Sequence, residues 1–236
     1  MQRYFDQIDA LSDIGAVLKN ARDRCYGQGI VRMSYHMTSA FDDPVSQTTT
    51  VYASGFSKEW LAKYEREAFR AADPIPRRVL HHGSMMTWAD AMVSEPNTRE
   101  NEEYFAAMAE EGLVHGIGVP LFGPGGRDGY AGIDFGKPIS EVEPDLLGVV
   151  RTLAQAEHQR ICVLIEQQTD VPVLSEREMQ VLTWTARGKS VSSIAAILDL
   201  SPDTVKTYSK RIYSKLDVSD RVGAVVKALQ MGLVRV

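Results

Sequence analysis

Apolar residues recur every three or four positions in some stretches of the chain and alternate with polar residues in others. The first spacing predicts helices over residues 5–25, 57–71, 99–111 and 141–167. The second predicts strands over residues 30–37, 49–53, 114–122 and 130–135, with the last two joined as a hairpin by a glycine-rich loop. This mixture favours an α/β/α sandwich around an antiparallel sheet for residues 1–166.

Residues 175–236 show only helical spacing. Ser175 and Glu178 form a capping box, and Gly188 can end the helix that they begin. Further helices are expected over residues 190–198, 202–216 and 220–231. In the last helix the expected inward residues are Val222, Val225, Val226 and Leu229. The polar, proline-containing segment 167–174 is interpreted as a linker, so the fold class is α+β: the sandwich and a small all-α domain.

The second and third of these helices have the layout of a helix-turn-helix. Asp199 can adopt the left-handed backbone of a tight turn, Ser201 then caps the next helix, and small Ala195 lets the two helices cross closely. The outer face of the later helix is basic and hydroxylated. The predicted DNA-binding residues are Ser201, Thr204, Lys206, Thr207, Lys210 and Arg211. The alternative is a helical hairpin whose basic face is merely solvated.

Charge and composition narrow the class of protein. Hydrophobic residues make up 44% of the 236 residues and charged residues 24%, which excludes wholesale disorder. Residues 169–236 carry a net charge of +3 and residues 1–168 a net charge of −8, so the tail is the part suited to a polyanion. With no bilayer-length apolar run and no apolar signal core at the start, a cytoplasmic protein without membrane contact is expected. Cys25 and Cys162 are expected to be reduced thiols.

The tail resembles the DNA-binding domain of LuxR-type transcription regulators. The resemblance covers residues 174–234. It is carried by Leu174–Leu182, Trp184–Lys189, Ile194-Ala195, Thr204–Lys206, Lys215-Leu216 and Gly232-Leu233. Ser193 and Tyr208 depart from the usual Glu and His. The resemblance implies that the later helix of the pair enters the major groove of double-stranded DNA.

In the first domain, aromatic residues share one face of the helix predicted over residues 57–71. Phe56, Trp60 and Tyr64 recur at i, i+4 and i+8, Asp73 follows, and Trp88 offers another aromatic wall. A plain core stripe is the alternative. However, the polar tips of Trp and Tyr and the Asp73 carboxylate need partners when they are buried. A ligand with one donor and several carbonyl groups would satisfy them.

This constellation resembles the autoinducer-binding domain of quorum-sensing LuxR-type regulators. The matching residues are Trp60, Tyr64, Asp73-Pro74, Trp88, Gly112, Gly116 and Pro120. The resemblance implies an N-acyl-homoserine lactone as ligand. Trp60 would donate to the lactone carbonyl, Asp73 would accept from the amide N–H, and Tyr64 and Trp88 would pack the ring and the head of the acyl chain. Phe56 and Ile75 complete the predicted ligand-binding set. Phe56 and Gly132 depart from a Tyr and a hydroxyl residue found in other members.

The sequence therefore predicts a ligand-responsive transcription regulator with no cofactor, metal or catalysis. It is expected to bind an inverted-repeat DNA site as a homodimer, with RNA polymerase as a further partner. The dimer contact is expected on the long helix, at Leu146, Val150, Leu153, Ile161 and Leu164, unless that stripe is used up by the sheet. Three alternatives remain: a different small molecule, a constitutive DNA-binding dimer, and an enzyme that acts on the lactone.

Overall fold

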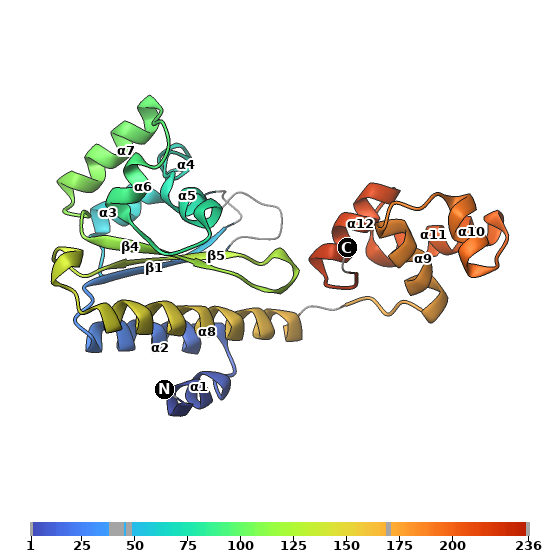
Figure 1. The fold of residues 1–236 in the computed structure, drawn as a ribbon, viewed down its shortest axis with the longest axis horizontal. Coiled ribbons are helices and arrows are strands. Elements are labelled where there is room, and N and C mark those ends of the chain that lie inside the picture. The colour runs from blue at the N-terminus through green and yellow to red at the C-terminus, as the bar shows by residue number, and fades with distance from the viewer. Residues whose placement is uncertain (1, 38–44, 46–48, 169–170, 235–236) are drawn as a thin grey trace. The chain divides into compact units, whose positions relative to one another are not determined.

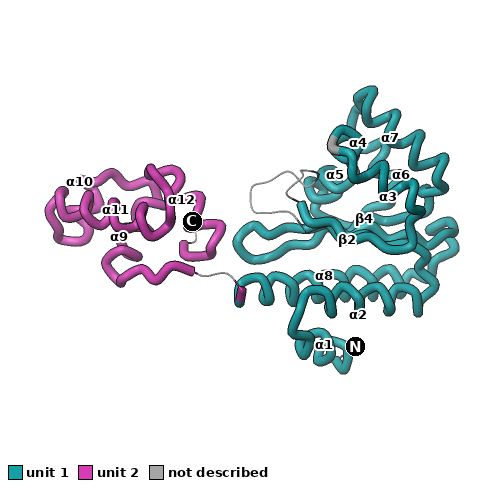
Figure 2. Tube along the Cα trace, turned by 180° about the vertical axis from the view of Figure 1, so that it is seen from behind, with its two compact units in different colours: residues 1–167 teal, residues 168–236 magenta. Residues whose placement is uncertain are grey.

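The computed structural model describes residues 2–37, 45, 49–168 and 171–234. The chain divides into two compact units, Met1–Gln167 and Gln168–Val236, which Figure 2 colours separately. The predicted linker 167–174 contains residues 169 and 170, which lie outside the described residues. None of the helices in the described ranges combines the length and the hydropathy needed to span a bilayer.

The first unit contains a five-stranded sheet in the order β2-β1-β5-β4-β3. The strands are β1 (Arg32–Met37), β2 (Thr50–Ser54), β3 (Met86–Thr87), β4 (Gly116–Leu121) and β5 (Gly129–Asp134). All neighbouring strands are antiparallel. The predicted β4–β5 hairpin is confirmed, with Leu121 opposite Gly129 across the glycine-rich loop.

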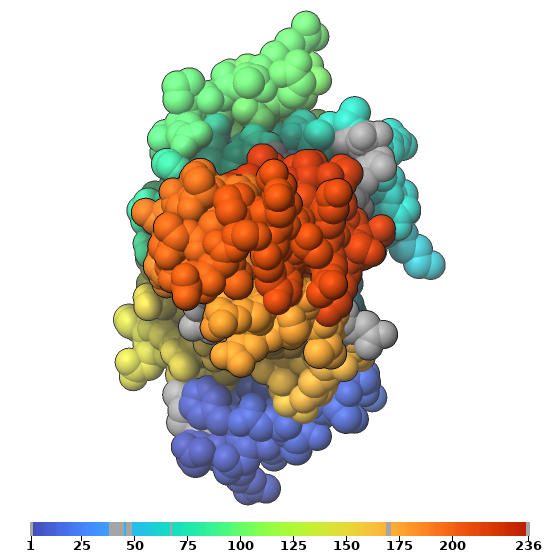
Figure 3. All heavy atoms as spheres, turned by 90° about the vertical axis from the view of Figure 1, so that its right-hand side faces the viewer, coloured from blue at the N-terminus to red at the C-terminus, as the bar shows by residue number. Residues whose placement is uncertain are grey.

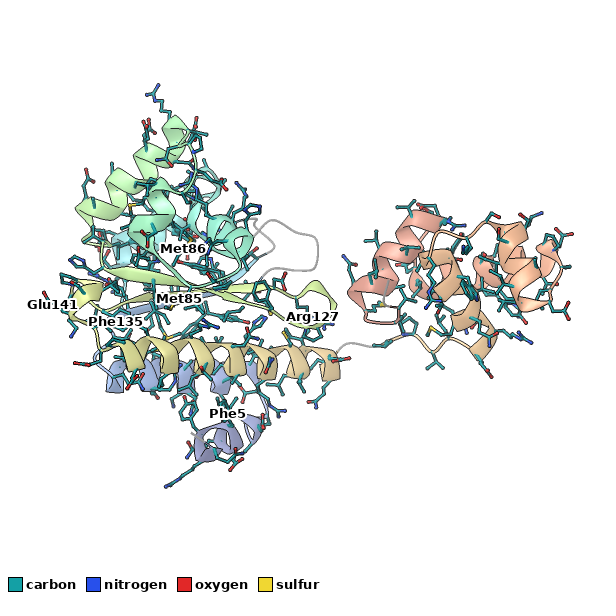
Figure 4. All side chains as sticks on the ribbon, viewed as in Figure 1. Phe5, Met85, Met86, Arg127, Phe135 and Glu141 are labelled. Carbon is teal, nitrogen blue, oxygen red and sulfur yellow. The ribbon has the colours of Figure 1, made fainter. Side chains whose placement is uncertain are left out.

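Helices α2 (Ile14–Gly27) and α8 (Pro144–Gln168) cover one face of the sheet (Figure 1). Between these helices and the sheet lies an apolar core that includes Val17, Ile133 and Ile161. Helix α1 (Gln2–Asp9), which bears Phe5 in Figure 4, is tied to the others through Tyr4, whose hydroxyl donates to Asn20 (2.7 Å).

The apolar stripe of α8 that was expected to form the dimer contact packs against the sheet instead. Val150, Leu153, Ile161 and Leu164 are at most 3% exposed, and Leu146 packs against the same cluster. Most of the stripe is therefore used by the sheet, which favours that alternative over a dimer contact at these residues.

Five helices cover the opposite face: α3 (Lys58–Tyr64), α4 (Glu67–Ala71), α5 (Ile75–His82), α6 (Trp88–Val93) and α7 (Arg99–Glu110) (Figure 1). Two glycines of β4 allow them to approach. A Cβ atom on Gly116 would lie 2.4 Å from the Trp88 ring, and one on Gly118 would lie 2.5 Å from Val79. Met85 and Met86 point to opposite faces of the sheet, because Met85 packs against the α2–α8 core and Met86 against the helices above (Figure 4).

Three predicted helices of the first unit are corrected, and three elements were missed. The predicted helix 5–25 is two helices, because the Asp13 side chain accepts from the Ala16 amide (2.8 Å) and starts a new helix there. The predicted helix 57–71 is interrupted at Arg66, whose backbone is extended. Helices α5 and α6 and strand β3 were not predicted. Helix α8 begins at Pro144 instead of residue 141, after a short 3-10 turn over Ile139–Glu141.

The second unit is all helical, as predicted. It contains α9 (Glu176–Ala186), α10 (Val191–Leu198), α11 (Pro202–Leu216) and α12 (Arg221–Gln230), and Figure 3 shows its packed surface in orange and red. The Ser175–Glu178 capping box, the left-handed Asp199 (φ 53°) and the Ser201 cap are confirmed. Lys215 Nζ donates to the Val173 carbonyl (3.0 Å), so the end of the predicted linker is attached to this unit.

The inward face expected for the last helix is wrong at Val222 and Val226, although Leu229 packs against the core as expected. Ala224 and Ala228 are the residues of α12 that are fully buried, whereas Val222 is 71% exposed and Val226 38% exposed. The Asp220 side chain accepts from the Val222 and Gly223 amides and sets where the helix begins. The small alanines then face the core, because they allow the closest approach of the neighbouring helices.

Candidate functional site

A cavity of about 320 Å³ lies between the sheet and the helices α3 to α7. The six predicted ligand-binding residues all line it: Phe56, Trp60, Tyr64, Asp73, Ile75 and Trp88. The structure thus brings together residues that the chain spreads over 33 positions. Most of the remaining wall is aromatic or aliphatic, which suits a ligand with a large apolar part.

Asp73 is the main charged acceptor among these residues. It is only 4% exposed, and its carboxylate accepts from Tyr64 Oη (2.8 Å) and from the Ile75 amide (3.0 Å). Burial raises the pKa of Asp73 to about 6, although these hydrogen bonds and Arg70 act in the opposite direction. The carboxylate is therefore ionised at neutral pH but costly to keep so, and a further donor from a ligand would stabilise it.

The two tryptophans differ in what their indole N–H groups do. Trp88 Nε1 donates to Tyr130 Oη (2.9 Å), which fixes the ring across the cavity. Trp60 packs edge-to-face with Phe69 and at a tilt of 57° with Tyr104. Among the described residues, its indole N–H makes no hydrogen bond. The Ser57 hydroxyl caps α3 by accepting from the Trp60 amide (3.0 Å), so the start of the helix sets the place of this ring.

Several cavity residues were not predicted from the sequence. They include Ser34 and His36 of β1, Arg70 of α4, Tyr104 and Met108 of α7, Leu113, and Tyr130 of β5. The alternation of polar Ser34 and His36 with apolar Met33 and Tyr35 was a usable signal, because such alternation assigns the polar pair to one face of a strand. Tyr104 had no comparable signal, since its partners lie on other helices.

Neither a metal site nor a reactive thiol is found among the described residues. No group of three or more His, Cys, Asp or Glu side chains there is placed to hold a metal ion. Cys25 and Cys162 are buried free thiols, and burial raises the pKa of each to about 11, which keeps them as unreactive neutral thiols.

The second unit presents the predicted DNA-binding residues on α11. Ser201 caps this helix by accepting from the Thr204 amide (3.1 Å), and Val205, Ile212 and Leu216 are buried beneath it. The exposed members of the predicted set are Ser201, Lys206, Thr207, Lys210 and Arg211, whereas Thr204 is half-buried. Lys206 pairs with the exposed Asp203 (3.0 Å). A basic helix face of this kind, held at a fixed angle by the turn, is suited to the major groove.

Comparison with known proteins identifies the two units. Residues 13–161 match the model of the autoinducer binding domain, and residues 172–228 match that of bacterial regulatory proteins of the luxR family. The quorum-sensing-dependent transcriptional regulator RpaR of Rhodopseudomonas palustris is 31% identical over 187 residues, 78% of this chain and 74% of RpaR. The chain belongs to the LuxR family.

A second relative agrees in sequence, and solved structures agree in fold. The quorum-sensing regulator RhlR of Pseudomonas aeruginosa is 27% identical over 195 residues, 81% of this chain and 79% of RhlR. The crystal structure of Escherichia coli SdiA matches with a TM-score of 0.75 at 20% identity, covering 96% of this chain and 94% of SdiA. Its complex with octanoyl-rac-glycerol also scores 0.75, at 18% identity, covering 100% of this chain and 96% of that one.

As a LuxR-family chain, the protein is a quorum-sensing transcription regulator with one domain for a small-molecule autoinducer and one for DNA. It is not an enzyme, so the rival hypothesis of lactone turnover is dropped. The cavity lies within the matched autoinducer binding domain, and Trp60, Tyr64, Asp73 and Trp88 of the residues that carried the resemblance line it.

Proposed function

We propose that the autoinducer is an N-acyl-homoserine lactone bound in this cavity. The observation that carries the proposal is the pairing of a buried acceptor with an unpaired donor. Asp73 offers a carboxylate to the amide N–H, and the Trp60 indole N–H is available to the lactone carbonyl. Tyr64, Trp88, Phe56 and Ile75 supply the rings and the aliphatic surface around them. Ligands of other chemistry remain the alternative.

Substitution of these two residues tests the ligand class. Trp60→Phe keeps a ring but removes the donor, and Asp73→Ala removes the acceptor. Each change should weaken lactone binding by about one to two decades, because one buried hydrogen bond costs ~1–3 kcal/mol to lose. Isothermal titration with a panel of acyl-homoserine lactones measures this. Octanoyl glycerol, which has no amide N–H, serves as the comparison ligand.

Binding of the same lactones can also be measured through the stability of the protein. A ligand bound only by the folded protein adds about 2.7 kcal/mol to the free energy of unfolding at a hundredfold excess over Kd. If no acyl-homoserine lactone moves the melting temperature, while octanoyl glycerol does, the alternative ligand class is correct.

For the DNA-binding function, we infer that the protein acts in the cytoplasm and binds an inverted-repeat DNA site as a homodimer. Residues Ser201, Thr204, Lys206, Thr207, Lys210 and Arg211 of the α11 region are proposed to contact DNA. Lys206 and Thr207 are proposed to lie nearer the bases and Lys210 and Arg211 nearer the phosphates. A twofold dimer places half-site centres about 10 base pairs apart or a multiple of this. RNA polymerase is the further proposed partner at the promoter.

A further inference from the structure

Strand β1 places two polar side chains in the wall of the cavity. Met33 and Tyr35 point into the core on the α2–α8 side, whereas Ser34 and His36 line the cavity on the other side. Both are buried, with 9% of Ser34 and 3% of His36 exposed. Polar groups at such positions cost folding free energy unless they find a partner.

One ring nitrogen of His36 has no such partner in the part of the chain that the structure describes. Its ring lies edge-to-face with Tyr64 and with Tyr130, with centroids 5.8 Å and 5.1 Å apart. Within the described residues, its buried Nδ1 atom makes no hydrogen bond. Burial, and then the nearby positive charge of Arg70, lower the pKa of His36 to about 3. The imidazole is therefore neutral and can donate from one nitrogen and accept at the other.

A glycine gives Ser34 access to the cavity. Ser34 is paired with Gly132 across the β1–β5 ladder. A Cβ atom on Gly132 would lie 2.7 Å from Ser34 Oγ and 3.0 Å from Tyr130 Oη. Any larger residue at position 132 would crowd the Ser34 hydroxyl. The space over Gly132 therefore lies beside two hydroxyl groups.

This polar region is close to Asp73. Tyr64 connects the two, because its hydroxyl donates to Asp73 (2.8 Å) while its ring contacts the His36 ring. Arg70 adds a second buried nitrogen, Nε, that has no partner among the described residues. A ligand whose amide N–H reaches Asp73 would thus have the first carbons of its acyl chain near Ser34 and His36.

We propose that Ser34 and His36 form a second polar subsite that binds an oxygen atom on the acyl chain, close to the amide. The chain is then selective for 3-oxo- or 3-hydroxy-acyl-homoserine lactones over unsubstituted ones. This inference rests on the proposed ligand class and extends it to the substituent that the protein discriminates.

The test compares ligands that differ in one oxygen atom. Octanoyl-, 3-oxo-octanoyl- and 3-hydroxy-octanoyl-homoserine lactone are titrated against the full-length protein by calorimetry. The wild-type protein should bind one of the oxygenated ligands about five- to tenfold more tightly than the unsubstituted one, the effect of one added hydrogen bond.

The variants Ser34→Ala and His36→Phe should each reduce this preference to about twofold or less. Ser34→Ala removes a single oxygen and tests the subsite even if His36→Phe fails to fold. Val51→Ala is the matched control. Val51 pairs with His36 in the sheet and lines the same cavity with carbon atoms only, so its loss should change the affinity for all three ligands in the same ratio.

Two results would overturn the inference. In the first, octanoyl-homoserine lactone binds as tightly as both oxygenated ligands, which leaves the proposed function intact and refutes only the subsite. In the second, the preference exists but survives in both Ser34→Ala and His36→Phe, so that other groups provide it. Absence of binding by all three lactones would instead refute the proposed function, and the subsite with it.

Discussion

Asp73 carries an electrostatic cost that a ligand can relieve. Its pKa of about 6 lies above the usual range because the carboxyl is buried, so the free energy that Asp73 contributes to folding is most favourable at acid pH. That contribution is lost as the pH rises through about 6, where the folded protein must release the proton. At neutral pH the Asp73 carboxylate of the ligand-free protein is therefore ionised, and a hydrogen-bond donor on the ligand would stabilise it.

We expect lactone affinity to rise with pH between 5 and 7. The bound amide N–H favours the ionised carboxylate, so binding below pH 6 must release a proton and the Kd at pH 5 should be about tenfold higher than at pH 7. His36, with a pKa of about 3, stays neutral throughout this window. Calorimetry in two buffers of different ionisation enthalpy measures both the affinity and the proton released.

Asp73→Asn is the control for this pH dependence. The variant cannot ionise at position 73, so its weaker binding should be flat over the same range. A tenfold pH dependence that persists in Asp73→Asn would show that another group is responsible.

At the scale of elements, the glycines of β4 determine how closely the helical layer approaches the sheet. A Cβ atom at position 116 would overlap the Trp88 ring at 2.4 Å. Trp88 is held in turn by its hydrogen bond to Tyr130 (2.9 Å). The cavity wall therefore depends on a strand position that carries no functional group at all.

Gly116→Ala should destabilise the protein by about 1–3 kcal/mol, as overpacking of a core does, and should also weaken ligand binding by displacing Trp88. Gly148→Ala is the counterpart on α8, where a Cβ atom meets nothing within 4 Å. In a helix interior this change should stabilise by about 0.5–1 kcal/mol. Urea denaturation gives both values, and equal destabilisation by the two changes would contradict the packing argument.

Local signals decide how much of the fold the sequence can predict. In the second unit, Ser175, Asp199 and Ser201 each fix a helix boundary through their own backbone or side chain, and each boundary was predicted. In the first unit, the short α5 and α6 gain their stability from contacts with the sheet, so their spacing alone was too brief to predict them. Val222 and Val226 of α12 were predicted to be buried because the helical spacing of apolar residues fits them as well as Ala224 and Ala228. The core has room only for the smaller alanines.

The same limit applies to the ligand cavity. Trp60, Tyr64 and Asp73 were predicted from their spacing and polar groups, and a family resemblance assigned their roles. The strand residues that complete the cavity could not be found in this way. His36 and Tyr130 meet there only through the register of β1 and β5, in which they are direct partners. Register is a property of strand pairing, so no local pattern within either strand could have joined them.

At the scale of the whole molecule, the proposed homodimer needs a contact surface other than the α8 stripe, most of which is buried against the sheet. The second unit offers one. Val222 and Val226 lie four residues apart on α12, 71% and 38% exposed, and the core beneath them is closed by Ala224 and Ala228. Residues spaced by four share one helix face, so two copies of this face could pack around a twofold axis between the half-sites.

We therefore expect a Val222→Asp/Val226→Asp double variant to lose the twofold contact. Four carboxylates would meet at the dimer axis, and desolvating like charges is strongly unfavourable. The fold should persist, because both positions are exposed in the single chain. On an inverted repeat selected with the wild-type protein, the variant should bind each half-site independently and more weakly, as measured by mobility shift and sedimentation. Val93→Asp, at an 80% exposed valine of the first unit, is the matched control and should leave DNA binding as it is. Dimers of wild-type affinity in the double variant would place the self-contact elsewhere, with exposed Val163 of α8 as the next surface to test.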